Sequence, residues 1–405
     1  MKPSGIEWIG DIPEDWEVKK VKRLFSYQKG KNAALLTKEY ISLHPGEYPV
    51  LSGQTENDGI LGYYESYEFD LDKDSIFVTT VGAKAMSTKL VNAKFSLSQN
   101  CALLHKIDEK ADVRFLHYAL FPMFEWQKSM ISLIMQPSLR FEDLDKATLP
   151  YPPLKTQERI ADYLDKKCGE IDATIAKQKE IIEKLKAYKQ SLISETVTKG
   201  LDKSAPLKPS GIDYLGDIPS HWEIKKLKFL VALIDNKTKD GHSISLENIE
   251  SGTGKLIETE NTYDGEGISF KENDLLFGKL RPYLAKVYLS ALKGRALGDF
   301  YVMRANKCIN PNFLKFVLLS DWFIKIVDSS TYGTKMPRAS WDFTGGMRIP
   351  LPPISEQDCI SSYLETKCSE VDTFIIEKQN IIQKLDEYKK SLIFECVTGK
   401  RDLWV

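Results

Sequence analysis

The sequence repeats itself at long range, and this repeat constrains the fold more than any other feature. Residues 2–20 are KPSGIEWIGDIPEDWEVKK, and residues 208–226 are KPSGIDYLGDIPSHWEIKK. Residues 151–198 and 351–398, which begin YPPLKTQERI and LPPISEQDCI, form a second matching pair, whereas the stretches between these shared edges hardly resemble each other. The period is far longer than that of solenoid repeats. We therefore expect one scaffold, built twice, that presents two different surfaces.

Length and composition indicate a globular chain of more than one domain. Its 405 residues suffice for two or three domains, and 42% hydrophobic and 28% charged residues are ordinary values. Met1 leads into a polar segment, and no apolar run approaches the ~18 residues of a membrane span, so we expect a cytoplasmic protein. The net charge of −1 does not suit a chain that holds nucleic acid unaided. Basic residues cluster locally instead, after WEVKK and WEIKK.

Two long amphipathic helices are predicted, within residues 151–200 and 351–405. Paired prolines precede each helix, and apolar residues then recur at three-four spacing, which is typical of a coiled-coil seam. The seam residues are Ile160, Leu164, Ile171, Ile175, Ile182, Leu185 and Leu192 in the first helix, and Ile360, Leu364, Val371, Ile375, Ile382, Leu385 and Leu392 in the second. The polar residues Gln178 and Lys378 occupy one common seam position. A helix of about 40 residues extends roughly 60 Å and needs a partner. Antiparallel pairing within the chain is expected, and a homodimeric coiled coil is the alternative.

Residues 1–150 and 201–350 are predicted to be α/β domains. Buried strands are expected at residues 74–80 and 274–278, and helices at about 113–130, despite Pro122, and 311–327.

Motifs that carry catalytic chemistry are missing from the sequence. Gly252-Thr253-Gly254-Lys255 lacks the spacing and the hydroxyl residue of a phosphate-binding loop and is interpreted as a turn. The six cysteines show no CxxC pairing, which argues against a metal site and favours reduced, mostly buried thiols. We therefore expect no catalytic residues and no metal.

Candidate contact residues for DNA come from loops at matching places in the two repeats. Loop 82–84 is taken to correspond to loop 278–283, with Gly82 aligned to Gly278, and loop 136–140 to loop 335–340, aligned on their prolines. Amide and cationic side chains fit base edges and phosphates. The candidates are Gln54, Lys84, Gln99, Asn100, Gln136, Arg140, Lys279, Arg281, Tyr283, Lys335 and Arg338. Solvated loop side chains are the alternative for each. Phe141, Trp341, Trp16 and Trp222 are interpreted as core residues rather than stacking platforms for bases.

The GIxxxGxIPxxWExKK opening, the PPLxxQE start of a long helix and the order of segments resemble the specificity subunits of type I restriction-modification enzymes. The resemblance extends over the whole chain. It implies two target recognition domains (1–150 and 201–350), each recognising half of a split DNA sequence, and two conserved helices (151–200 and 351–405). In that family the helices form an antiparallel coiled coil that spaces the half-sites and binds two modification (methyltransferase) subunits, to which restriction (translocase and nuclease) subunits attach. S-adenosylmethionine, ATP and magnesium are then expected in the partner subunits and no cofactor in this chain.

Two rival functions remain open at this stage. A coiled-coil scaffold whose globular domains bind proteins is one, and an enzyme with an unrecognised site is the other. The second is disfavoured because a shared active site would preserve polar residues between the two interiors.

Overall fold

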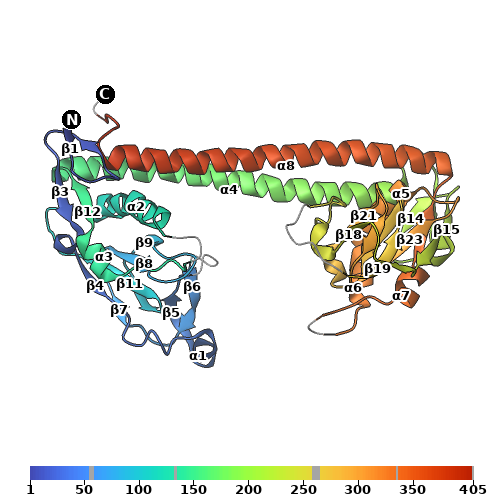
Figure 1. Cartoon of the computed structure of the whole chain (residues 1–405), viewed down its shortest axis with the longest axis horizontal. Helices are drawn as coiled ribbons and strands as arrows, with labels where there is room; N and C mark the ends of the chain where they lie inside the picture. The colour runs from blue at the N-terminus through green and yellow to red at the C-terminus, as the bar shows by residue number, and fades with distance from the viewer. Residues whose placement is uncertain (54–58, 132–134, 258–264, 334–335, 404–405) are drawn as a thin grey trace. The chain divides into compact units, whose positions relative to one another are not determined.

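The computed structural model describes residues 1–53, 59–131, 135–257, 265–333 and 336–403, in two compact units. Unit 1 comprises Met1–Lys177 and Asn380–Val405, and unit 2 comprises Gln178–Gln379. The division falls inside two long helices, α4 (Leu154–Lys199) and α8 (Ile354–Val397). Each unit therefore holds an α/β body and one part of each long helix (Figure 1).

Unit 1 contains, within its described residues, two four-stranded sheets and two short strand pairs. The antiparallel sheet has the order β4 (Phe25–Gln28), β11 (Cys101–Lys106), β8 (Ser75–Thr79), β9 (Thr88–Val91). The mixed sheet has the order β6 (Ile60–Tyr64), β5 (Pro45–Leu51), β10 (Lys94–Leu97), β7 (Phe69–Asp70). The pairs are β1 (Lys2–Pro3) with β2 (Asp11–Ile12) and β3 (Glu17–Lys20) with β12 (Thr148–Tyr151). The helices are η1 (Val21–Arg23), α1 (Lys38–Leu43), α2 (Val113–Ser129) and α3 (Phe141–Lys146).

Unit 2 repeats this plan. Its antiparallel sheet has the order β16 (Val231–Ile234), β23 (Phe300–Ala305), β20 (Asp274–Gly278), β21 (Val287–Leu289). Its mixed sheet has the order β17 (Lys237–Thr238), β19 (Gly267–Phe270), β22 (Gly294–Ala296), β18 (His242–Ile244). The pairs are β13 (Leu207–Pro209) with β14 (Asp217–Pro219) and β15 (Glu223–Lys226) with β24 (Arg348–Leu351). The helices are η3 (Leu227–Phe229), η4 (Leu246–Asn248), η5 (Pro282–Leu284), α5 (Pro311–Leu319), α6 (Asp321–Ser329) and α7 (Trp341–Gly346).

The mixed sheets keep a common centre and differ at their edges. In both units a central strand has one parallel and one antiparallel neighbour: β10 lies between β5 and β7, and β22 lies between β18 and β19. The fourth strand, however, joins the parallel neighbour in unit 1 (β6 beside β5) and the antiparallel neighbour in unit 2 (β17 beside β19). The sequence divergence between the repeats therefore changes a sheet edge while the antiparallel sheet is retained.

The predicted helix at 311–327 is interrupted, which corrects the sequence analysis. Ser320 is fully buried in an extended conformation between α5 and α6, and its hydroxyl donates a hydrogen bond to the carbonyl of Val317. A serine that bonds to the preceding turn in this way competes with helix continuation. The amide of Asp321 then donates to the hydroxyl of Ser194 on α4, which fixes the new start. In unit 1, α2 continues through Pro122 as predicted.

A glutamine in the first turn of each long helix ties that helix to its α/β body. Gln157 is fully buried, accepts a hydrogen bond from the amide of Asp112 (2.9 Å) and donates to the carbonyl of Pro152 (2.8 Å). Gln357 is equally buried and does the same with Asn310 (2.7 Å) and Pro352 (2.8 Å). Asp112 and Asn310 in turn cap α2 and α5.

The tryptophans of the repeated opening segments are core residues. Trp16 and Trp222 are almost fully buried. Each lies against the glycine that ends a long helix: a Cβ added to Gly200 would lie 3.0 Å from Trp222, and one added to Gly399 would lie 3.2 Å from Trp16. Both glycines have a left-handed backbone (φ +73° and +70°) that favours glycine at a helix end.

The helices α4 and α8 pack antiparallel in each unit (Figure 1). In unit 1 the early α4 residues Ile160 and Leu164 share a core with Leu392 and Val397 at the end of α8. In unit 2 the late α4 residues Ile193 and Val197 share a core with Ile360, Leu364 and Cys368 near the start of α8. Of the predicted seam residues, Ile160, Leu164, Ile171, Ile175, Ile182, Ile360, Leu364, Val371 and Leu392 are buried, and Leu185, Leu192, Ile375, Ile382 and Leu385 are half-buried.

Candidate nucleic-acid interface

Two loops chosen from the sequence lie side by side in unit 1. One follows β8 and the other precedes α3. Val81 forms an antiparallel bridge with Ser138, the amide of Gly82 donates to the carbonyl of Pro137 (3.1 Å), and the amide of Leu139 donates to the carbonyl of Thr80 (2.7 Å). These backbone bonds fix the relative position of the loops independently of their exposed side chains.

Unit 2 builds the same loop pair with the same bonds. Leu280 bridges to Arg338, the amide of Arg281 donates to Pro337 (2.8 Å), and the amide of Ala339 donates to Lys279 (2.9 Å). Equivalent bonds align Gly82 with Arg281, so the expected alignment of Gly82 with Gly278 is wrong. Gly278 still belongs to β20, and its amide is bonded to the carbonyl of Lys286.

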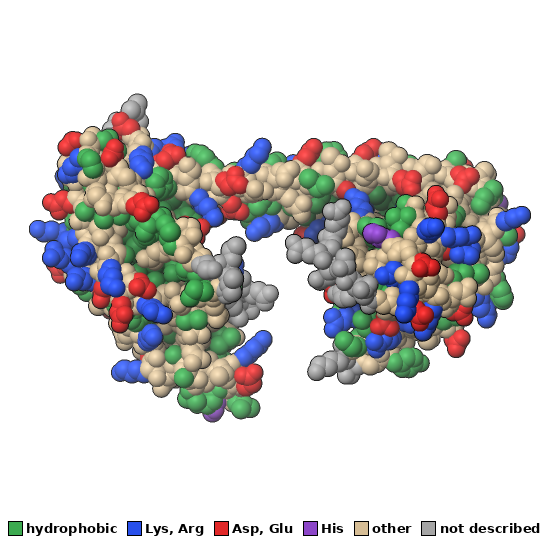
Figure 2. Space-filling model, in the orientation of Figure 1, with side chains coloured by type: hydrophobic (Ala, Val, Ile, Leu, Met, Phe, Trp, Pro, Cys, Tyr) green, Lys and Arg blue, Asp and Glu red, His purple; other side chains and the backbone are tan. Residues whose placement is uncertain are grey.

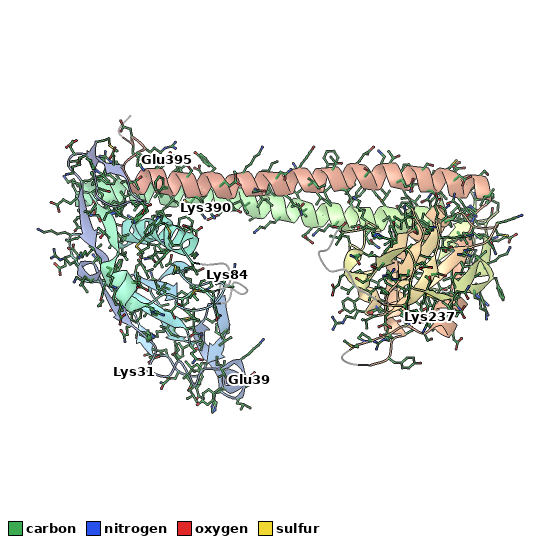
Figure 3. All side chains as sticks on the ribbon, in the orientation of Figure 1. Lys31, Glu39, Lys84, Lys237, Lys390 and Glu395 are labelled. Carbon is green, nitrogen blue, oxygen red and sulfur yellow. The ribbon has the colours of Figure 1, made fainter. Side chains whose placement is uncertain are left out.

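The loop pair of unit 1 borders a hollow lined by both apolar and polar residues. Lys84, Gln99 and Asn100 line a cavity of about 470 Å³, together with Thr37 and Ser98. Lys84 comes from the loop after β8 (Figure 3), and all three candidates are exposed. Asn100 has a left-handed backbone (φ 65°), and its carbonyl accepts the amide of Thr80 at 2.7 Å. The amide side chains of such residues carry both the donor and the acceptor needed at an adenine edge.

Gln136 and Arg140 flank the second loop of unit 1 and are both exposed. Arg140 is the residue just before α3, where the backbone is extended. Phe141, which follows, is partly buried and stacks on Tyr27 with ring centroids 4.9 Å apart. The aromatic residue thus belongs to the core, as predicted.

In unit 2 the charged residues Lys279, Asp299 and Arg338 occupy the positions of Thr80, Asn100 and Ser138 in unit 1. Arg338 donates from Nε to Oδ2 of Asp299 at 3.0 Å, and its Nη2 lies 2.9 Å from the same oxygen. The Nζ of Lys279 lies 3.8 Å from Oδ1 of Asp299 and 5.6 Å from the ring centre of Tyr301. The hydrogen bond and the charge of Asp299 raise the pKa of Arg338. Two of the predicted cationic residues therefore share one carboxylate.

Tyr301 lies against the loop pair of unit 2 and bonds to its backbone. Its hydroxyl donates to the carbonyl of Ala339 at 2.7 Å, and its ring lies 5.2 Å from that of Trp341. Burial, together with the charges of Asp342 and Asp299, raises the pKa of Tyr301 to about 12. Trp341 is partly buried against the core of unit 2, as predicted.

Arg281 directly precedes the short helix η5, and Tyr283 lies within it. Arg281 is exposed and adopts a left-handed backbone (φ 50°) that non-glycine residues rarely adopt. Tyr283 is half-exposed, and its amide donates to Oδ1 of Asp328. The remaining candidates, Gln54 and Lys335, lie outside the described residues.

Asp299 was missed by the sequence analysis. It directly precedes β23, just as Asn100 precedes β11, and its carbonyl accepts the amide of Lys279 (2.8 Å) as that of Asn100 accepts Thr80. An alignment of these two strands would have identified the position. The local sequence around Asp299 carries no signal of its own.

The segment Gly252–Lys255 is a turn, as interpreted from the sequence. Gly252 and Gly254 have left-handed backbones, and the hydroxyl of Thr253 donates to the carboxylate of Glu250 at 2.7 Å. Lys255 donates to Asp372 of α8 at 2.8 Å. Over the described residues, no group of three His, Cys, Asp or Glu side chains is placed to hold a metal ion, and no helix is long and apolar enough to cross a membrane.

Figure 2 shows acidic and basic side chains intermixed over the visible face, in keeping with the net charge of −1. The two α/β units share one backbone arrangement at their loop pairs, and each packs against paired antiparallel helices. The side chains at the two loop pairs differ. This combination defines a class of protein with two related recognition surfaces of different chemistry.

The chain belongs to the family of type I restriction-modification DNA specificity proteins. The model of the "Type I restriction modification DNA specificity domain" matches residues 13–187. A putative type I specificity subunit of Mycoplasma pneumoniae is 32% identical over 188 residues, which cover 45% of this chain and 75% of the relative. The MjaVIII specificity subunit of Methanocaldococcus jannaschii is 26% identical, with 96% of this chain and 93% of the relative covered.

The fold is also found among solved structures. One matching chain comes from a structure that is described as showing the structural basis of complex assembly and conformational transition of the type I R-M system. The match has a TM-score of 0.68 and 13% identity, and it covers 96% of this chain and 100% of that one.

Proposed function

We propose that this chain is the non-catalytic subunit that recognises DNA in a type I restriction-modification complex, with each unit contacting one half of a bipartite target. Family membership supports DNA recognition over a protein scaffold. The observation that carries the two-part target is the loop pair: equivalent backbone bonds place Asn100 and Ser138 in unit 1 where unit 2 has Asp299 and Arg338. Different side chains on one frame select different bases.

The proposed contact residues are the candidates at or beside the two loop pairs, all exposed except the half-buried Lys279. They are Lys84, Gln99, Asn100, Gln136 and Arg140 in unit 1 and Lys279, Arg281, Tyr283 and Arg338 in unit 2. Cationic members are suited to phosphates as well as to guanine, and the amides are suited to adenine.

The helices α4 and α8 are proposed to set the spacer between the half-sites and to bind two methyltransferase subunits. Restriction subunits attach through these, and S-adenosylmethionine, ATP and magnesium are bound by the partner subunits. A net charge of −1 leaves much of the phosphate neutralisation to those partners. Insertion of one matched heptad into each helix should therefore lengthen the spacer and leave both half-sites unchanged.

Reconstitution tests the function directly. The purified chain, mixed with a methyltransferase subunit of its restriction-modification system, should form a complex with two such subunits per chain, measured by light scattering. Its methylated sites, mapped on genomic DNA, should form a split motif with methylation on both strands. The isolated chain should bind DNA weakly. A continuous motif, or a one-to-one complex with full activity, would contradict the proposal.

A further inference from the structure

We propose that Asp299 is a positioning residue that holds Arg338 for recognition of a guanine in the half-site contacted by unit 2. The inference rests on the proposed function and deepens it, since it assigns one base of the target to one pair of side chains.

The geometry of the ion pair leaves one end of the guanidinium group available. Asp299 accepts hydrogen bonds along the Nε and Nη2 side of Arg338, at 3.0 and 2.9 Å. Guanine presents two acceptors, O6 and N7, in the major groove, and the terminal Nη1 and Nη2 groups of arginine bind both at once. A guanidinium group bonded along its side therefore still offers its end to a base. Within the described part of the chain, the Arg338 side chain hydrogen-bonds to Asp299 alone.

Exposure of the two side chains agrees with this division of roles. The side chain of Arg338 is 49% exposed, whereas that of Asp299 is 23% exposed. The carboxylate thus lies deeper, beneath the cation that it orients. An unsupported arginine would lose the freedom of several torsions on binding, and a preformed ion pair reduces that cost.

The backbones on both sides of the pair are held by other groups. The carbonyl of Asp299 accepts the amide of Lys279 at 2.8 Å, and Arg338 bridges to Leu280. The carbonyl of the next residue, Ala339, accepts the hydroxyl of Tyr301. Because these bonds do not involve the ion pair, removal of the Asp299 charge is expected to leave the loop pair in place.

Unit 1 has no such pair at the equivalent positions. The equivalent bonds place Asn100 where unit 2 has Asp299, and Ser138 where it has Arg338. Neither is charged, so the inference concerns the second half-site alone.

The test uses the complex with its methyltransferase subunits and three variants. Asp299→Asn removes the carboxylate charge at constant size, and Arg338→Lys keeps the charge but removes the planar fork. Asp321→Asn is the matched control, since its ion pair with Lys325 is an exposed i, i+4 pair on α6. Methylated motifs and DNA affinities at several salt concentrations are measured for each.

The wild-type complex should specify a G·C pair at one position of the second half-site. Arg338→Lys should lower the preference for that pair about five- to a hundredfold. Asp299→Asn should lower it about tenfold or less, while its affinity for unrelated DNA stays equal or rises, because a negative charge near the phosphates is removed. The first half-site should not change, and Asp321→Asn should match the wild type throughout.

A second half-site without any specified G·C pair would overturn the inference, as would wild-type preference in either variant. General loss of binding and stability in Asp299→Asn, with guanine preference retained in Arg338→Lys, would also overturn it. Failure of the proposed function is distinguishable from these results, since the wild-type complex itself would then show no bipartite methylation.

Discussion

Lys189 on α4 donates to Oδ1 of Asp372 on α8 at 2.6 Å, and the repeat builds the same pair a second time, with Lys389 on α8 and Asp172 on α4 at 2.7 Å. The first pair lies in unit 2 and the second in unit 1. The two ion pairs differ in burial: the side chains of Lys189 and Asp372 are 11% and 16% exposed, against 28% and 56% for Lys389 and Asp172. One repeated ion pair therefore has two different environments.

We expect Asp372→Asn to destabilise the chain more than Asp172→Asn. The first substitution leaves the mostly buried Lys189 without its carboxylate and should cost about 1 to 3 kcal/mol, less than a fully buried pair would. The second breaks a largely exposed pair and should cost about 0.5 kcal/mol or less. Urea denaturation of both variants measures the difference. Equal effects would show that burial does not determine the contribution of this pair.

The stability that depends on Asp372 should disappear in acid. Burial by itself would raise the pKa of Asp372, but hydrogen bonds from Lys189 and Lys255 prevail and hold it below its ordinary value of 3.8. A carboxyl whose pKa is lowered by folding stabilises the protein above the unfolded pKa, and this stabilisation is lost as the pH falls through the folded pKa. The difference between wild type and Asp372→Asn should thus be full at pH 7 and shrink below about pH 4. A difference that is constant from pH 7 to pH 3 would contradict this.

Gln357→Leu should weaken the attachment of α8 to unit 2. The glutamine is fully buried, and its loss leaves the amide of Asn310 and the carbonyl of Pro352 without their bonds. We expect a cost of about 2 to 4 kcal/mol, since each unpaired buried group costs about 1 to 3 kcal/mol. Cys359→Ala, an exposed change two residues further along α8, is the control and should cost less than about 0.5 kcal/mol. Thermal unfolding compares them.

Arg281→Ala should weaken DNA binding by the reconstituted complex. Loss of a base contact costs about 1 to 3 kcal/mol and relaxes one position of the second half-site, whereas loss of a phosphate contact weakens binding to all sequences and reduces the salt slope by about 1. Arg281→Gly is a useful partner variant, because glycine adopts the left-handed backbone (φ 50°) without strain. Both variants should bind DNA equally weakly. Wild-type affinity and salt slope in both would remove Arg281 from the interface.

Exchange of residues 20–150 for those of a relative with another target should change one half of the methylated motif. The loop pair of unit 1 lies within this segment, and the loop pair of unit 2 lies wholly outside it. Mapping of methylated adenines before and after the exchange tests this. A simultaneous change in both halves would show that the units do not recognise DNA independently.

The repeated elements could be predicted from sequence because the patterns that indicate them are local or periodic. The apolar stripe from Ile160 follows from helical spacing, and β8 and β20 follow from short apolar runs with glycine nearby. The two loop pairs could be chosen as candidates for the same reason, since turn residues and cations mark them. The break at Ser320 could not be foreseen, because it depends on a hydroxyl bond to Val317 and on contact of the next residue with Ser194 on α4.

The sequence by itself determined that one scaffold is built twice, with two long helices and two unlike interiors, since repetition and periodicity are written along the chain. Only the tertiary structure decided which side chains meet at the candidate site. Lys279, Asp299 and Arg338 come from three separate segments, and backbone bonds between β20, the start of β23 and the loop before α7 bring them together. Contacts between segments far apart in sequence depend on register, and a shift of a few residues, such as that from Gly278 to Arg281, changes every partner.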